Sequence, residues 1–440
     1  MVQVYPQAQG TTEENMHTEP RIRLTRRHVG HLAARLDELP LHLIADPREG
    51  TVKHSIERLL RAAVVGHAAG CKGLGDVEHM TGAMATGARR ALRLPGRVPD
   101  TTLRDVLVRV EPNGLRRLLH AGIRRAHRRK QLAHDLPLRV ASLDGKGTAS
   151  WLFDRPNAKH KYGQRQDSRT VVRTVTACLV STAARPCLDA FPIPPETNEM
   201  GVFPAALQAL LDAYGDDFFD VVMYDSGAAS LGNATLVRSH GKHYVFSLTD
   251  NQPTLLAEAQ RVLGRLDAGK ALAESTDVDG ADVVVRRLYK TSELAGFLDW
   301  AHLATALRVQ TVRVDRLTGE TRHEDRYYLT SIAHDALTAD QWLTLLRRRW
   351  AVENECHNLW DTAFEEDDRP WILLPQGMVV VMLLRRIASN LLALYRSVTT
   401  RAEHKRKVAW PTLLRAIGTA LLQATQEAMA GLRRRNRVTD

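Results

Sequence analysis

Four short segments rich in Val, Leu, Ala and Tyr constrain the fold of this chain more than any other feature. Each has the length and composition of a β-strand, and they lie at 138–144, 170–180, 219–225 and 243–248. An apolar segment with helical spacing, 202–215, separates the second from the third and ends at Gly215. Because strands alternate with a helix, this part of the chain is predicted to form an α/β sheet.

The regions around these strands have different patterns. Apolar residues recur at helical spacing over 29–135 and from residue 378 onwards, and strongly so over 340–360. Three further strand-like segments lie at 283–290, 306–316 and 325–332, with a turn at Thr318–Gly319 between the last two. The sequence therefore predicts a flexible tail (1–28), a helical N-terminal domain (29–136), an α/β core in two parts (137–252 and 337–400), a β-rich insertion between them (253–336) and a basic helical C-terminal tail (401–440).

Two aspartates stand where α/β sheets place ligands. Asp144 ends one apolar strand and precedes Gly-Lys-Gly, and Asp225 ends another and precedes Ser-Gly. Carboxylate oxygens are the ligands that Mg²⁺ prefers, together with water and substrate phosphate. With a third acid, such a pair would hold two metal ions for phosphoryl transfer, although an aspartate at a strand end also serves as a turn or cap residue.

The helical segment 340–360 supplies a candidate third acid. Arg349, Glu353 and His357 are spaced four apart and are predicted to share one helix face, which Trp350 and Asn354 adjoin. Apolar neighbours indicate that Glu353 is partly buried and needs a partner. That partner is either Arg349 or a metal ion.

The net charge of +11 favours a polyanionic partner. Nucleic acid is the first expectation, because neutralising phosphates releases counterions, and a membrane surface is the rival. The segment 115–131 concentrates cations, among them Arg124, Arg125, Arg128, Arg129 and Lys130, and no acidic residue occurs between Pro112 and His134. It is either a solvated helix face or a helix that contacts phosphates, and the lack of compensating acids favours the second. The tail 432–438 is basic as well.

Several classes of protein are not indicated. No run of 18 or more apolar residues is present, and the polar first twenty residues do not form a secretory signal. The four cysteines are far apart and form no CxxC motif, so neither structural zinc nor a disulfide framework is expected. We expect a cytoplasmic protein with no membrane contact.

The segment 347–371, RRRWAVENECHNLWDTAFEEDDRPW, resembles the HWxIEN-LHWxLD-xxFxED signature of DDE-type transposases from bacterial insertion sequences, in the branch that includes the H-repeat-associated proteins. Three other segments resemble family motifs in the same order: DPREG (46–50), SLDGKG (142–147) and the stretch 224–255 that begins YDSGAAS and ends NQPTL. Matching positions in the first signature are Trp350, Glu353, Asn354, His357, Asp361, Phe364, Glu366 and Asp367.

This resemblance implies an RNase H-like catalytic core with a β-rich insertion, preceded by a helical DNA-binding domain and followed by C-terminal helices. It implies that Asp144, Asp225 and Glu353 are catalytic and hold two Mg²⁺ ions, with Mn²⁺ as a substitute. The activity would be strand cleavage at the ends of an insertion sequence and strand transfer into target DNA. The partners would be double-stranded terminal inverted repeats, target DNA and a second copy of the chain in a synaptic complex, and the protein would be nucleoid-associated.

Some positions depart from the pattern of the wider superfamily around the glutamate. Leu346 stands where a tyrosine is usual and Trp360 where a lysine is usual, so Arg349 and His357 are candidates to contact the terminal phosphate instead. Lys146 either contacts phosphate or is solvated, and Trp350 either packs in the core or stacks on a base. Asn354 and His357 are candidate DNA contacts, and His357 is not expected to bind the metal because Mg²⁺ prefers oxygen.

Two other functions are compatible with the sequence. A catalytically silent protein derived from a transposase would bind DNA without cutting it, and an RNase H-like nuclease would cleave DNA structures without terminal repeats. Mg²⁺-dependent nicking of DNA that carries the element ends distinguishes the three.

Overall fold

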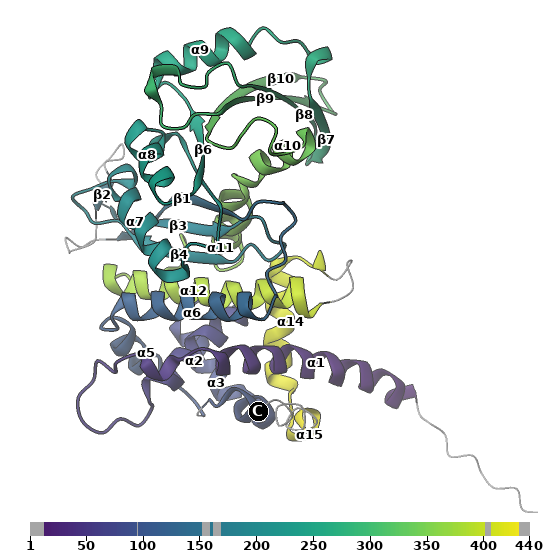
Figure 1. Ribbon diagram of the computed structural model, residues 1–440. Coiled ribbons are helices and arrows are strands. Elements are labelled where there is room, and N and C mark those ends of the chain that lie inside the picture. The colour runs from purple at the N-terminus through teal and green to yellow at the C-terminus, as the bar shows by residue number, and fades with distance from the viewer. Residues whose placement is uncertain (1–12, 95, 152–158, 162–168, 401–405, 431–440) are drawn as a thin grey trace, which may run out of the picture. The chain divides into compact units, whose positions relative to one another are not determined.

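The computed structural model describes residues 13–94, 96–151, 159–161, 169–400 and 406–430. The chain divides into two compact units (Figure 1), one formed by Met1–Val110 with Thr399–Asp440 and the other by Glu111–Val398. The predicted basic tail at 432–438 lies outside the described residues. The whole is a mixed α/β fold with N-terminal helices, one large mixed sheet and C-terminal helices.

The first unit is helical. Its elements are α1 (Glu13–Glu38), η1 (Leu41–Leu43), α2 (Ile56–Ala68), α3 (Leu74–Ala83), α4 (Thr86–Leu92), α5 (Asp100–Leu107), α14 (Trp410–Gln423) and α15 (Gln426–Met429). Helix α1 packs against α14 and α4, and α2 packs against α3. The C-terminal segment is hydrogen-bonded to α4, because the Ala88 amide donates to the Ala424 carbonyl over 3.1 Å.

Two features of this unit differ from the sequence prediction. Helix α1 begins at Glu13, inside the segment that was predicted to be a flexible tail. Helices α14 and α15 pack with the N-terminal helices, whereas the sequence placed 401–440 in a separate tail. The difference arises from tertiary packing, because Leu413, Leu414 and Ile417 are buried on α14, and α14 packs against α1 at the other end of the sequence.

The second unit is built around a ten-stranded sheet. Its strands are β1 (Val140–Trp151), β2 (Lys159–Lys161), β3 (Arg169–Leu179), β4 (Cys187–Pro192), β5 (Val221–Tyr224), β6 (His243–Leu248), β7 (Ala273–Asp279), β8 (Asp282–Thr291), β9 (Thr305–Asp315) and β10 (Thr321–Thr330). Their order is β2-β3-β1-β5-β6-β10-β9-β8-β7, and β4 also pairs with β3. Strands β5 and β6 are parallel to β1, whereas β3 is antiparallel to it.

The helices of this unit cover the sheet. They are α6 (Pro112–Arg128), α7 (Glu199–Tyr214), η2 (Ser226–Ala228), α8 (Leu231–Ser239), α9 (Pro253–Leu263), η3 (Ala268–Lys270), η4 (Phe297–Asp299), α10 (Ala339–Arg348), the π-helix η5 (Val352–His357), α11 (Asn358–Thr362), α12 (Pro375–Leu394) and the π-helix η6 (Tyr395–Thr399). Helices α6 and α12 lie side by side (Figure 1) and both contact β4. Helix α7 packs on β3 and β4, and η5 packs on β1 and β3.

The predicted β-rich segment continues the core sheet. Strand β10 pairs with β6 from Tyr327–Leu248 to Thr330–Val245, so β7 to β10 extend the sheet that begins with β1. The turn between β9 and β10 lies at the predicted place. There the Asp315 carboxylate accepts hydrogen bonds from the Leu317 and Thr318 amides, and Gly319 adopts a positive φ of 74°.

One helix, Pro375–Thr399, has the length and apolar composition that could cross a membrane. All of its apolar window is buried in the protein, and the core helix of a folded unit passes the same test. Its two arginines, Arg385 and Arg386, are completely buried.

Candidate active site

Asp144 is a half-buried carboxylate in an environment that opposes its charge. It lies inside β1, which continues to Trp151, whereas the sequence predicted that this strand ends at Asp144. Paired with β3 along its length, the segment after Asp144 is a strand and not a turn. Burial together with the charge of Glu353 raises the pKa of Asp144 to about 8. The charge of Arg349 lowers the pKa of Asp144, and the charges of Asp225 and Glu199 raise it further. Three acids from different elements, Glu353, Asp225 and Glu199, therefore interact electrostatically with Asp144.

Asp225 occupies the point where β5 ends and η2 begins. It is the N-cap residue of η2, and its Oδ1 accepts a hydrogen bond from the Gly227 amide over 2.9 Å. Asp225 is half-buried, and this hydrogen bond uses one of its two carboxylate oxygens. The cap explains locally why an aspartate follows this strand.

Glu353 lies on a π-helix rather than on the continuous α-helix that was predicted for 340–360. Helix α10 ends at Arg348, η5 carries Glu353, and the α-helical pattern resumes at Asn358. The Arg349 guanidinium lies 3.4 Å from the Glu353 carboxylate, so this pair of the predicted face does meet. A π-turn inserts one residue into the helical pattern, which hydrophobic periodicity does not detect, and such turns occur often at functional sites.

His357 contacts Asp144 directly. Its Nδ1 lies 3.3 Å from Oδ2 of Asp144. Burial, followed by the charges of Arg386 and Lys146, lowers the pKa of His357 to about 3, so the imidazole is neutral near pH 7. The two side chains therefore meet as a contact between an uncharged ring and the Asp144 carboxyl group, and not as an ion pair. This places His357 beside the candidate metal ligand, although the sequence suggested a contact with DNA.

Lys146 is an internal ion-pair partner in this structure. Its side chain is 5 % exposed, and its Nζ lies 2.6 Å from the Asp361 carboxylate and 3.4 Å from that of Asp367. The Thr148 hydroxyl, two residues along β1, donates to Asp367 over 3.1 Å. Alternate residues of β1 thus hold the segment after η5, and contact of Lys146 with a DNA phosphate would require breaking these ion pairs.

A second, fully buried cluster lies behind this segment. Arg386 on α12 donates two hydrogen bonds to Glu366, over 2.6 and 2.8 Å, and neither side chain is exposed. The Arg386 guanidinium also lies 3.4 Å from the centre of the Trp360 ring, and that ring lies 5.3 Å from His357. This network gives Glu366 and Trp360, which both lie in the segment 347–371, a structural role behind His357.

Trp350 lies between two guanidinium groups. Arg326 of β10 lies 4.3 Å and Arg349 5.1 Å from its ring centre, and Tyr328 contacts the ring edge-on. The ring is half-buried, which leaves both packing and base stacking open as roles. Asn354, one residue beyond Glu353, is exposed.

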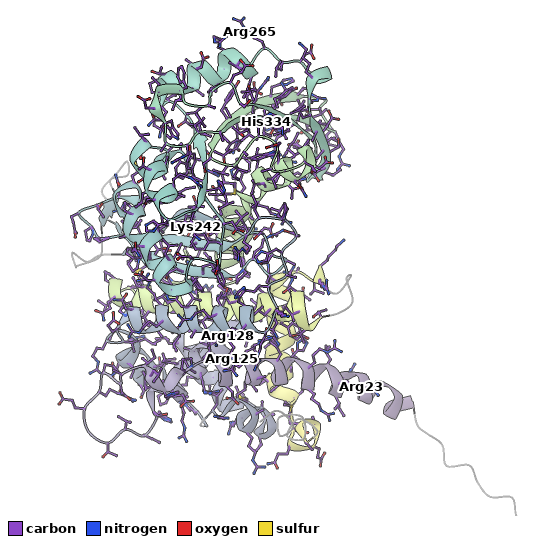
Figure 2. All side chains as sticks on the ribbon, viewed as in Figure 1. Arg23, Arg125, Arg128, Lys242, Arg265 and His334 are labelled. Carbon is purple, nitrogen blue, oxygen red and sulfur yellow. The ribbon has the colours of Figure 1, made fainter. Side chains whose placement is uncertain are left out.

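The basic residues of α6 fall on its solvent side and at its end. Arg124, Arg128, Arg129 and Lys130 are exposed and Arg125 is half-buried, and Figure 2 labels Arg125 and Arg128 on this helix. The Arg124 guanidinium donates to the Ala213 carbonyl over 2.9 Å. The opposite face, with Leu115, Leu119 and Ile123, is buried. Cations displayed on one face suit contact with phosphates, although a solvated face would have the same arrangement.

The candidate acids match a hard divalent cation in chemistry but do not form a closed metal site. Among the described residues, no three His, Cys, Asp or Glu side chains stand together in an arrangement that could hold a metal ion. Carboxylate oxygens are nevertheless the donors that Mg²⁺ and Mn²⁺ take, and the repulsion felt by Asp144 is what a bound cation would relieve. The residues therefore match such a cation in the kind of donor and in charge, and not in arrangement.

No family model matches the chain, and no curated protein matches it. Among solved structures, the chain is similar to a piggyBac transposase in a synaptic complex with hairpin DNA, determined by cryo-electron microscopy. The identity is 12 %, the match covers 95 % of this chain and 80 % of the other, and the TM-score is 0.40. A likeness at this level does not assign a function.

Proposed function

We propose that this protein is a DDE-type transposase that cleaves DNA at the ends of an insertion sequence and joins those ends to target DNA. The observation that carries the proposal is that Asp225 and Glu353, from distant parts of the chain, both raise the pKa of Asp144 by their charge. These are the three acids that the motif resemblance singles out. Structural carboxylates are usually paired with cations, whereas Asp144 has more acidic than basic groups acting on it.

An RNase H-like core is part of the proposal. The order β4-β3-β1-β5-β6, with β3 antiparallel to β1 and with β5 and β6 parallel to it, supports this assignment. Asp144 and Asp225 lie on and just after neighbouring strands, β1 and β5. The helix end that carries Glu353 packs on β1 and β3.

The residues of the chain have distinct roles in the proposed reaction. Asp144, Asp225 and Glu353 would hold two Mg²⁺ ions, or Mn²⁺ in their place. When bound, such ions supply activation of an attacking hydroxyl and stabilisation of the leaving oxygen. His357 contacts Asp144 through its Nδ1, and Arg349 offsets part of the negative charge beside Glu353. The Glu366–Arg386 cluster fixes Trp360, against which His357 rests.

The proposed partners are double-stranded element ends, target DNA and a second copy of the chain in the synaptic complex. Support comes from the net charge of +11 and from the exposed cations of α6. The proposed location is the cytoplasm, in association with the nucleoid.

One observation favours a second candidate, a catalytically silent DNA-binding protein. The described residues do not present three metal donors in one arrangement, as a site preformed for catalysis would. Nicking separates the two candidates. A supercoiled plasmid with the gene and its flanking DNA is incubated with the full chain and Mg²⁺, and nicks are mapped.

The wild type is expected to nick at the element ends, and Asp144→Asn, Asp225→Asn and Glu353→Gln are expected to abolish nicking while DNA binding remains. Glu355→Gln is the matched control, because Glu355 is exposed on the same π-helix and pairs with Arg185. Binding without nicking by the wild type would favour the silent protein. Nicking by a folded Glu353→Gln variant at the wild-type rate would refute the assignment of Glu353.

A further inference from the structure

A cationic hollow in the helical unit has no role in the function proposed above. Its volume is about 460 Å³, and it lies between the loop that joins η1 to α2 and the helix α5. The loop contains DPREG (46–50), one of the segments that resemble family motifs. Thr102 at the start of α5 and Arg109 just after its end both line the hollow, which therefore extends along this helix.

Arg48 fixes the shape of the loop. Its guanidinium donates to both carboxylate oxygens of Asp46, over 2.9 and 2.7 Å, and to the His54 carbonyl, over 2.6 Å. The Arg48 amide also donates to the Asp46 carboxylate over 3.1 Å. Segments without regular secondary structure are usually more mobile than helices, so these bonds hold His54 and its neighbour Lys53 in place at the wall of the hollow.

Two cations of the wall have no acidic partner. Lys53 and Arg109 are exposed, and neither forms an ion pair within the part of the chain that the structure describes. Nε of Arg109 donates to the Asp105 carbonyl over 2.8 Å, which leaves the terminal nitrogens of this guanidinium available. The acid in the lining is Glu49, which is exposed. Because Lys53 and Arg109 come from different elements and face one space, the hollow carries an excess of positive charge.

A buried imidazole forms part of the same wall. His54 is 7 % exposed, and its Nδ1 has no hydrogen-bond partner among the described residues. Buried polar atoms are normally satisfied by protein, water or a ligand. Burial lowers the pKa of His54, and the positive charges of Lys53, Arg48 and Arg58 lower it further. Surroundings that oppose a cation on the ring attract an anion into the hollow.

The composition of the wall selects the class of anion. Besides the charged groups it offers the hydroxyls of Thr51 and Thr102, and its apolar residues are Val52 and Pro99. Sites for drug-like molecules are lined mainly by apolar and aromatic side chains, which this wall does not provide. No Phe, Tyr or Trp among the described residues lines the hollow, and proteins hold single bases by stacking them on such rings. The wall therefore suits a phosphate group and not a base.

We propose that this hollow binds a phosphate of the DNA backbone through Lys53 and Arg109, an inference that rests on the proposed function for its choice of DNA as the partner. A phosphate contact fixes the position of a protein on the duplex without reading the sequence. The site is separate from the cations of α6, which belong to the other unit. Because Arg48 holds the loop before DNA arrives, little ordering of the wall is needed on binding.

The test measures DNA binding by the full chain in the absence of Mg²⁺. Fluorescence anisotropy follows two duplexes over a range of salt concentrations, one from the DNA that flanks the gene and one of unrelated sequence. The variant Lys53→Gln with Arg109→Gln removes the two unpaired charges. Arg90→Gln with Arg104→Gln is the matched control, because these exposed residues of α4 and α5 do not line the hollow and their removal changes the net charge equally. Melting curves establish that both variants are folded.

The double variant of the hollow should lose one phosphate contact. We expect it to reduce the slope of log affinity against log salt by about one, and to weaken binding by the same factor for both duplexes. The control variant should keep the wild-type slope. Duplexes with a neutral methylphosphonate at one position at a time give a second readout, since the position that weakens the wild type should have no effect on the double variant of the hollow. A wild-type slope for that variant would overturn the DNA contact.

Inorganic phosphate distinguishes the DNA backbone from a free anion. If phosphate raises the melting temperature of the wild type but not of the double variant, while both bind DNA alike, the hollow takes a free anion and the DNA contact is refuted. If both proteins bind DNA alike and phosphate affects neither, the site is refuted, and nicking at the element ends would still support the proposed function. If the wild type binds neither duplex, the inference fails together with the proposed function.

Discussion

Substitution of Glu366 by Gln is expected to destabilise the unit Glu111–Val398 strongly. Glu366 is completely buried and accepts two hydrogen bonds from Arg386, and Arg385 lies 3.7 Å away. The neutral amide would leave two buried guanidinium groups without a counter-charge. Removing one partner of a buried ion pair costs about 3–5 kcal/mol.

The pKa of Glu366 gives a second route to the magnitude. Burial alone would raise this pKa, but the charge and hydrogen bonds of Arg386 lower it from 4.5 to about 2. Each tenfold change in proton affinity corresponds to about 1.4 kcal/mol, so the ionised pair stabilises the folded state by about 3 kcal/mol. Because the folded-state pKa is depressed, this contribution is complete above about pH 4.5 and is lost as the pH falls towards about 2.

Thermal unfolding near pH 7 measures the effect. A loss of about 3–5 kcal/mol corresponds to a decrease in melting temperature of roughly 6–20 °C. The control is Glu324→Gln, whose ion pair with Arg326 is exposed and should contribute less than about 1 kcal/mol. Addition of Arg386→Met to Glu366→Gln should cost less than the sum of the single changes, because it removes one unpaired charge. A decrease of no more than about 2 °C for Glu366→Gln would refute the reasoning.

Three further predictions concern the site, the DNA and helix α6. The folded-state pKa of Asp144 is raised from 3.8 to about 8, so the metal-free folded protein holds an extra proton between these values and loses stability as the pH rises through them. The melting temperature of Asp144→Asn should therefore rise relative to that of the wild type from about pH 4 to about pH 8. A difference in melting temperature that stays constant over this range would contradict the prediction. Arg128→Ala and Lys130→Ala should each reduce the slope of log affinity against log salt for DNA binding by about one if each residue contacts a phosphate, and an unchanged slope would make them solvated residues. Glu111→Ala should cost about 1 kcal/mol in denaturant unfolding, because the Glu111 carboxylate caps α6 by accepting from the Asn113 and Gly114 amides, whereas loss of a surface charge alone would leave stability unchanged.

Local patterning predicts much of the second unit. Strand β6 coincides with the predicted 243–248, and helix α7 covers most of the predicted 202–215. Strand β9 lies within one residue of the predicted 306–316 at each end. In each case apolar residues at the period of the element meet a buried face, so the sequence carries the signal directly.

Other elements depend on contacts that a local pattern does not contain. Strand β4, which was not predicted, is short and pairs with β3 beside the packed helices α6 and α12. The π-helix η5 keeps the apolar pattern of a helix while changing which side chains meet. Glu353 stays with Arg349, but His357 turns to Asp144, a residue more than 200 positions earlier.

The candidate site shows the same division. Asp225 was found because its strand does end there, Asp144 was found although β1 continues past it to Trp151, and Glu353 was found because of its motif. Glu199 was missed because a glutamate in a first helical turn is ordinary. The available signal was Gly145, since a glycine inside a strand often marks a place where another group approaches closely. Here that group is the Glu199 carboxyl group, which occupies the space that a β-carbon at position 145 would need. The short segment Asp144–Gly145 therefore carries two requirements, an acid at the first position and the lack of a side chain at the second. Gly145→Ala should consequently lower the melting temperature of the chain even though it alters no charge, and an unchanged melting temperature would contradict this close approach.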